Sequence, residues 1–116
     1  MIVSGIPAFG KDDYESKIRG MSENLKTTLA ASGAEIGDVV EINTFHAQAR
    51  STKEFQAEFE VLKKVHAKYF KGHYPAWAAV GTTALLAEDA PAEKRVMAIV
   101  GSGKNPKKAA ALSKQD

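Results

Sequence analysis

The sequence predicts an α+β fold, in which one mixed sheet carries two helices packed on a single face. Three observations support this prediction. The 116 residues are 44% hydrophobic and 26% charged, which suits one globular domain. Apolar residues recur at helical spacing in two segments, and β-branched residues gather in four others. These segments follow the order strand, helix, strand, helix, strand, strand, which favours a single sheet with helices on one side.

The first strand and the first helix are expected within residues 1–33. Residues 1–6 (MIVSGI) are rich in β-branched side chains and predict a strand. Asp12 or Asp13 is expected to cap the following helix, because a carboxylate accepts hydrogen bonds from the free N–H groups of a first turn. One apolar stripe predicts the helix itself: Ile18, Met21, Leu25 and Leu29. Gly33 is expected just beyond the end of this helix.

The second strand and the second helix are expected within residues 38–72. The segment DVVEINTFHA, residues 38–47, predicts a strand with apolar side chains on both faces. Alternation places Val40, Ile42, Thr44 and His46 on one face, and Val39, Glu41, Asn43 and Phe45 on the other. The letters STKE, residues 51–54, spell a capping box before an apolar stripe that includes His66 as a packed side chain. Because a sheet covered by helices on one side leaves such a strand half uncovered, the open face is expected to bind other copies of the chain.

The last two strands are predicted at residues 76–86 and 93–101, joined as a hairpin. Residues 1–100 form the expected domain, and the Lys-rich residues 101–116 are expected to be a flexible tail. The formal net charge of +2 arises from this tail, and the rest of the chain is nearly neutral. This distribution argues against nucleic acid as the main partner.

Several classes of function are disfavoured by what the composition lacks. The chain has no cysteine, so a disulfide framework, a thiolate nucleophile and a Cys-based metal site are excluded. The three histidines, His46, His66 and His73, are spaced too irregularly to predict a metal site, and no cofactor is expected. No apolar run reaches the ~20 residues of a membrane span. The first residues do not resemble a signal peptide, and a cytoplasmic location is expected.

Four segments carry a resemblance to a known family. They are VSG (residues 3–5), ENLKTTLAASGAEIGDVVEINTF (23–45), HAKYFKGHYPAW (66–77) and RVMAIV (95–100). Together they resemble the Rid family, the reactive intermediate deaminases also called the YjgF or L-PSP family. The resemblance implies a chorismate-mutase-like fold and a homotrimer with a small-molecule cleft between each pair of neighbouring subunits. It also implies that Ser4 and Gly5 offer contacts to a ligand.

Two positions depart from the pattern that the resemblance implies. Trp77 stands where deaminating members usually carry the second Arg of Arg-Pro-Ala-Arg, which holds the substrate carboxylate. An indole offers one donor and no charge, so it cannot replace a guanidinium in this role. Arg95, or Lys94 with a slip of one residue, stands where those members place the Glu that positions the attacking water. Glu93 lies two residues before Arg95 and therefore on the same strand face.

These departures leave three hypotheses for function. In the first, the cleft binds or transforms a hydrophobic or aromatic metabolite, and its ligand-binding residues are Ser4, Gly5, Tyr74, Trp77 and Ala79. In the second, deamination of an imine or enamine, or a lyase-type step, survives with Glu93 as the base and Arg95 as the anion holder. In the third, the protein cleaves RNA or inhibits translation, as the resemblance also allows. Two structural alternatives compete with these roles: Trp77 as interface packing, and Glu93–Arg95 as a plain salt bridge.

Overall fold

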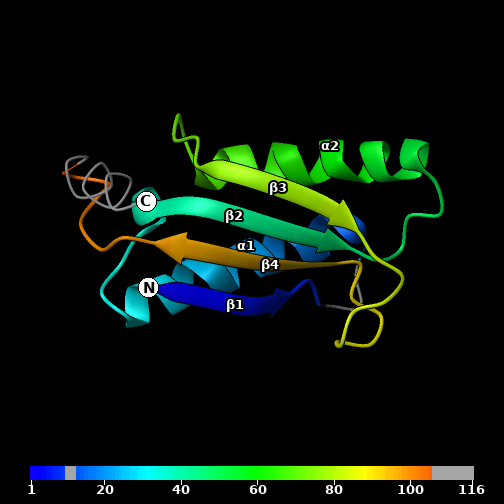
Figure 1. Ribbon diagram of the computed structural model, residues 1–116, viewed down its shortest axis with the longest axis horizontal. Coiled ribbons are helices and arrows are strands. Elements are labelled where there is room, and N and C mark those ends of the chain that lie inside the picture. Colours follow the sequence, from blue (N-terminus) through cyan, green and yellow to red (C-terminus); the bar gives the residue numbers. More distant parts are fainter. Residues whose placement is uncertain (10–12, 106–116) are drawn as a thin grey trace.

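The computed structural model describes residues 1–9 and 13–105. These residues form β1 (Ile2–Pro7), α1 (Tyr14–Ala31), a 3-10 turn η1 (Ile36–Asp38), β2 (Val39–His46), α2 (Thr52–Tyr69), β3 (Ala76–Gly81) and β4 (Ala92–Ala98). In Figure 1 the sheet lies in front of α1, and α2 runs along β3. The two helices contact each other and share one core with the sheet. The predicted fold class, one mixed sheet with two helices on one face, is confirmed.

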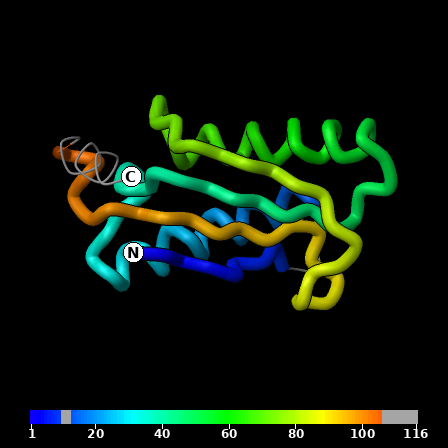
Figure 2. Tube along the Cα trace, in the orientation of Figure 1, coloured from blue at the N-terminus to red at the C-terminus, as the bar shows by residue number. Residues whose placement is uncertain are grey.

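The strand order is β1–β4–β2–β3, so the last of these strands along the chain, β4, lies between the first two strands. β4 is antiparallel to both of its neighbours, whereas β3 is parallel to β2 at the edge. Figure 2 shows the trace of β4 running between β1 and β2, which come from the other end of the sequence. The predicted hairpin of the last two strands is therefore wrong. Because α2 serves as the crossover that sets β3 parallel to β2, the other edge of β2 is left for β4.

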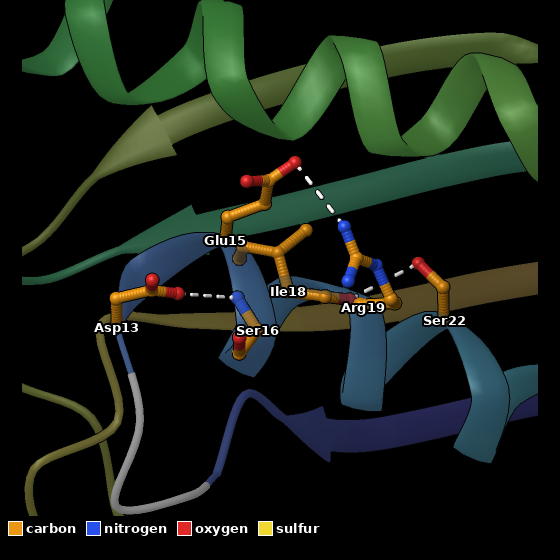
Figure 3. Close-up of polar contacts among 6 residues, drawn as sticks. All are labelled: Asp13, Glu15, Ser16, Ile18, Arg19 and Ser22. Atoms are coloured by element: carbon orange, nitrogen blue, oxygen red, sulfur yellow. Dashed lines mark hydrogen bonds and ion pairs between the residues drawn. The ribbon is translucent and has the colours of Figure 1, made fainter.

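Helix α1 begins at Asp13, which is one of the two predicted caps. The Oδ1 atom of Asp13 accepts a 2.9 Å hydrogen bond from the backbone N–H of Ser16 (Figure 3). Asp12, the other candidate, lies outside the described residues. One turn further, Arg19 pairs with Glu15 at 3.3 Å on the exposed side of the helix. Such an exposed pair contributes only about 0.3–0.5 kcal/mol, so the cap is the main signal for the start of the helix.

The other predicted helix boundaries agree with the structure. Gly33 follows α1 with φ of +80°, a conformation that favours glycine. Ser51 caps α2, and its Oγ accepts a 3.2 Å hydrogen bond from the backbone N–H of Glu54. The Glu54 side chain accepts from the backbone N–H of Arg50, one residue before the cap, at 2.6 Å. The capping box is thus present, with its second hydrogen bond shifted by one residue.

The core lies between the helices and the sheet face that they cover. The predicted stripe of α1 is fully buried, as are residues of α2 and alternate residues of the central strands: Ile18, Met21, Leu25, Leu29, Ile42, Leu62, Val65, Ala92, Val96 and Ala98. At the start of β2 the register shifts between Val39 and Glu41. Because of this irregularity, Val39 is buried on the same side as Ile42, and the predicted place of Val40 on that face is wrong.

The opposite face of the sheet carries no helix among the described residues. Its outward side chains on β2 and β4 are half-buried: Glu41, Asn43, Phe45, Glu93, Arg95 and Met97. On the edge strands Ile2 and Val80 are about half exposed, at 54% and 46%. Binding of further copies to this open face stays a prediction.

The first residues of the expected tail fold back onto η1. The backbone N–H of Gly103 donates to Asp38 Oδ1 at 2.9 Å, and Ser102 Oγ donates to the Asp38 carbonyl at 3.3 Å. Residues 106–116 lie outside the described part of the chain.

Candidate functional site

A bulge in β1 places two of the predicted ligand-binding residues beside the end of the sheet. The register between β1 and β4 shifts between Val3 and Ile6, so Ser4 and Gly5 together oppose Arg95. Gly5 has φ of +80°, which a residue with a side chain adopts only under strain. The bulge therefore depends on this glycine, and it sets two exposed residues, Ser4 and Gly5, opposite Arg95 of β4.

Glu93 and Arg95 lie on the open face of the sheet. Their neighbours on β2 are Phe45 and Asn43, which pair with them in register. Lys94, between them, points to the helix side and is 1% exposed. Across residues 1–9 and 13–105, neither Glu93 nor Arg95 forms an ion pair or a hydrogen bond through its side chain. The salt bridge between them, one of the structural alternatives, is thus not formed in this structure.

The structure therefore brings together one half of the predicted site: Ser4, Gly5, Glu93 and Arg95. The planar guanidinium of Arg95 can hold a carboxylate through two parallel hydrogen bonds. The carboxylate of Glu93 can accept and return a proton. Together these groups could bind a small anion and exchange a proton with it.

The other half of the predicted site lies on the opposite face. Trp77 Nε1 donates a 3.0 Å hydrogen bond to Thr44 Oγ1, and the indole packs against Phe59 and His66 of α2, with ring centroids 5.1 Å and 4.3 Å away. Thr44 is fully buried on the helix-covered face, whereas Arg95 faces the other way. Within one protomer, therefore, the indole and the guanidinium lie on opposite faces of the sheet, and their sharing of a cleft between subunits stays a prediction.

Two more predicted ligand-binding residues flank Trp77. Ala79 pairs with Thr44 in register and so shares the helix-covered face with the indole. Tyr74 lies in the turn before β3 and is 89% exposed. These three residues form the second half of the predicted site, separated from the first by the thickness of the sheet.

An aromatic row, which sequence reasoning missed, runs between α2 and the sheet. Each ring is 4.0–6.3 Å from the next, centroid to centroid, and the row contains all three histidines of the chain. Its members are, in order, Phe55, His46, Phe59, Trp77, His66, Phe70 and His73. The helical members recur at steps of four and seven, so part of the row was visible in the sequence. The strand members could be added only once the pairing of β2 with β3 was known.

Two histidines of this row are neutral at pH 7. His46 is 1% exposed, its Nε2 lies 2.9 Å from Thr44 Oγ1, and burial lowers its pKa to about 4. His66 is 8% exposed, and burial, helped by the positive charge of Lys94, lowers its pKa to about 4. In each ring the Nδ1 atom is buried without a hydrogen-bond partner in the described structure. Such orphaned nitrogens destabilise the folded state unless another molecule satisfies them.

Lys94 places a positive charge beneath α2. Its Nζ lies 5.7 Å from the centroid of the Phe70 ring, a cation–π distance. No carboxylate within residues 1–9 and 13–105 pairs with it. Burial lowers the pKa of Lys94 to about 8, so the amine stays mostly protonated at pH 7.

A hollow of about 240 Å³ opens where α2 ends and the chain turns into β3. We call it the Trp77 hollow; it is lined by Lys63, His66, Ala67, Phe70, Gly72, His73, Tyr74, Pro75 and Trp77. His73 is held in place by a 2.6 Å hydrogen bond from Nε2 to the Val39 carbonyl. A larger, more open hollow of about 530 Å³ lies near the ends of both helices, but no predicted site residue lines it.

The described residues hold neither a metal-binding cluster nor a membrane-spanning helix. No group of three or more His, Asp or Glu side chains there is arranged to hold a metal ion. Neither α1 nor α2 combines the length and the apolar character that crossing a membrane requires.

The chain is similar to known proteins over most of its length. The sequence profile of the family described as "Endoribonuclease L-PSP" matches residues 2–100. The RutC family protein YjgH of Escherichia coli (strain K12) is 32% identical over 78 residues, which are 66% of this chain and 55% of that protein. The mitochondrial protein MMF1 of Saccharomyces cerevisiae is 32% identical over 69 residues, 60% of this chain and 43% of that protein. The chain thus spans about half the length of the curated relatives it matches.

The fold is also found in solved structures. The crystal structure of Rv2704 from Mycobacterium tuberculosis, described as a member of the highly conserved YjgF/YER057c/UK114 family, superposes with a TM-score of 0.73. The two chains are 25% identical, and the match covers 85% of this chain and 77% of the other.

Proposed function

This chain belongs to the YjgF/L-PSP (Rid) family, and from that premise we propose that it forms a homotrimer with a small-molecule site in each cleft between subunits. The open face of the sheet supports this proposal, because it presents half-buried apolar side chains such as Phe45 and Met97 that neither α1 nor α2 covers. A second copy that packs on this face would bury them and would close the exposed side of the Glu93–Arg95 pair.

The observation that carries the proposal is the position of Glu93 and Arg95. Both lie on the open face and have no side-chain partner among the described residues; Arg95 lies opposite the bulge at Ser4 and Gly5, and Glu93 lies opposite Pro7. A guanidinium, a carboxylate and a serine hydroxyl at one place suit a small imine or enamine that bears a carboxylate. We therefore favour a deaminase that works with this rebuilt set of residues.

The reaction is a hydrolysis. Arg95 would hold the carboxylate of the substrate, and Glu93 would take a proton from a water molecule as its oxygen bonds to the imine carbon. The imine nitrogen gains protons, the carbon–nitrogen bond of the resulting carbinolamine breaks, and ammonia leaves a carbonyl product behind. An enamine would first take a proton on carbon to become the imine. Neither route requires a metal or an oxidant.

The two other hypotheses have less support on this face. A hydrophobic or aromatic ligand would need Trp77, but within one protomer the indole lies on the helix side, away from Arg95. RNA would need a basic surface, whereas Glu41 and Glu93 accompany Arg95 on the open face. A cytoplasmic location stays a prediction from the sequence.

The test is hydrolysis of 2-iminopropionate by the wild type and by Glu93→Gln, Arg95→Ala and Glu15→Gln. We expect Glu93→Gln to lose on the order of 10²-fold in kcat/KM, since it keeps the shape of the side chain but removes the base. Arg95→Ala should chiefly raise KM. Glu15→Gln, on the exposed side of α1, serves as the matched control and should be unchanged. Full activity of Glu93→Gln, or no turnover by the wild type, would overturn the proposal.

A further inference from the structure

We propose that the Trp77 hollow is a second binding site, contained within one protomer, for a small aromatic carboxylate. It lies on the helix side of the sheet and shares no lining residue with the site formed by Glu93 and Arg95. This second site can therefore be tested independently of the proposed deamination.

The size and walls of the hollow suit a single aromatic ring. A cavity of ~150 Å³ already accepts benzene, so about 240 Å³ leaves room for one ring with a short substituent. Five of its nine lining residues carry aromatic rings: His66, Phe70, His73, Tyr74 and Trp77. Tyr74 is 89% exposed and can fold over a ligand, because it is not engaged in packing the protein itself.

One polar group in the wall lacks a partner. His66 lines the hollow, is 8% exposed, and its buried Nδ1 makes no hydrogen bond in the described structure. Its ring is held between Phe70 and Trp77, with centroids 4.0 Å and 4.3 Å away, and so cannot turn freely to find one. The imidazole therefore offers a fixed ring surface to a ligand in the hollow, while its Nδ1 stays buried.

The charges around the hollow favour an anion. None of the nine lining residues is acidic. Among the described residues, Lys94 lies beneath Phe70 without a counter-ion, and Lys63 stands in the wall, paired there with the exposed Glu60 at 3.1 Å. An aromatic cation would meet an uncompensated positive charge, whereas a carboxylate would offset it. The combination of rings and buried positive charge therefore points to an aromatic acid.

The chain provides its own reporter for the test, because Trp77 is its only tryptophan and lines the hollow. Titration of the full-length protein with benzoate should change the tryptophan fluorescence in a saturable way. Benzyl alcohol, which is neutral, should bind about fivefold more weakly, and benzylammonium more weakly still. No saturable change up to ~10 mM benzoate would overturn the proposal, because that limit excludes binding of even millimolar affinity. Equal binding of all three probes would also overturn it, since the charge would then play no part.

Variants of residues on the two faces of the sheet show where benzoate binds. Tyr74→Ala should weaken benzoate about tenfold through the loss of one aromatic wall. Lys94→Met should remove most of the preference for benzoate over benzyl alcohol, and circular dichroism checks that both variants are folded. Glu15→Gln, on the exposed side of α1, is the matched control and should bind benzoate as the wild type does. If Arg95→Ala abolished benzoate binding while Tyr74→Ala left it intact, the ligand would occupy the other face and the inference would be wrong.

Discussion

Trp77 and Thr44 are joined by a 3.0 Å hydrogen bond that fixes the indole on the helix-covered face of the sheet. The same Thr44 hydroxyl lies 2.9 Å from His46 Nε2, so one buried oxygen serves both rings. Trp77→Phe would keep most of the packing against α2 but remove the donor. We expect a loss of about 1 kcal/mol in the free energy of unfolding, measured by urea denaturation followed by circular dichroism.

The matched control for this change is Tyr74→Ala, which removes an aromatic side chain that is 89% exposed. It should alter stability by less than ~0.5 kcal/mol. If Trp77→Phe cost no more than Tyr74→Ala, the hydrogen bond to Thr44 would not be a stabilising contact.

Lys94→Met should stabilise the protein at pH 7. The wild type buries an unpaired amine whose pKa falls to about 8 from the ordinary 10.5. This shift corresponds to about 3 kcal/mol of destabilisation at neutral pH, of which methionine should recover a part. The unfolded state binds one more proton than the folded state between pH 8 and 10.5, so wild-type stability should rise with pH in that window. Denaturation at pH 7 and pH 10 should show this rise in the wild type; the same rise in Lys94→Met would assign it to another group.

His46→Gln should flatten the acid side of the stability curve. Burial lowers the pKa of His46 to about 4, whereas the unfolded side chain titrates near 6.5. As pH falls from 6.5 to 4 the unfolded state takes up the extra proton, and the folded state loses up to about 1.4 kcal/mol per pH unit from this group. Glutamine keeps a polar group near Thr44 but does not titrate. Unfolding at pH 7, 6 and 5 should therefore show a smaller decrease for the variant; an identical decrease would mean that His46 is not the titrating residue.

Gly5→Ala should impair both stability and activity. Gly5 has φ of +80°, and a methyl group there would meet no neighbouring atom, so the cost is backbone strain of about 1 kcal/mol. Gly33→Ala is a close control, because Gly33 has the same φ and the same open surroundings but lies at the end of α1. Both variants should lose similar stability, and only Gly5→Ala should slow 2-iminopropionate hydrolysis. If Gly5→Ala and Gly33→Ala were equally active, the bulge at Gly5 would not contribute to the catalytic site.

The local features of this fold could be predicted from the sequence because each depends on a few neighbouring residues. The cap at Asp13, the end of α1 at Gly33 and the capping box at Ser51 are all of this kind. The position of β4 could not be predicted, since a segment after a ten-residue loop can pair with any free strand edge. The hairpin expectation failed for this reason.

The candidate site was predictable only in part, because it too depends on how distant strands pair. Glu93 and Arg95 share a face because alternation along one strand guarantees it. Whether Trp77 joins them depends on which face β3 presents after its crossover, and this is decided by pairing with β2 and by the hydrogen bond to Thr44. The aromatic row was missed because its strand members become neighbours only through the sheet register.

The mass of the protein in solution tests the central claim most directly, because the site needs the open face of the sheet to be closed by another copy. Sedimentation equilibrium of the full-length wild type should give three times the 12.5 kDa mass of the chain. A single-chain mass at every concentration measured would contradict the account, since Glu93 and Arg95 would then lie on a free surface instead of in a cleft.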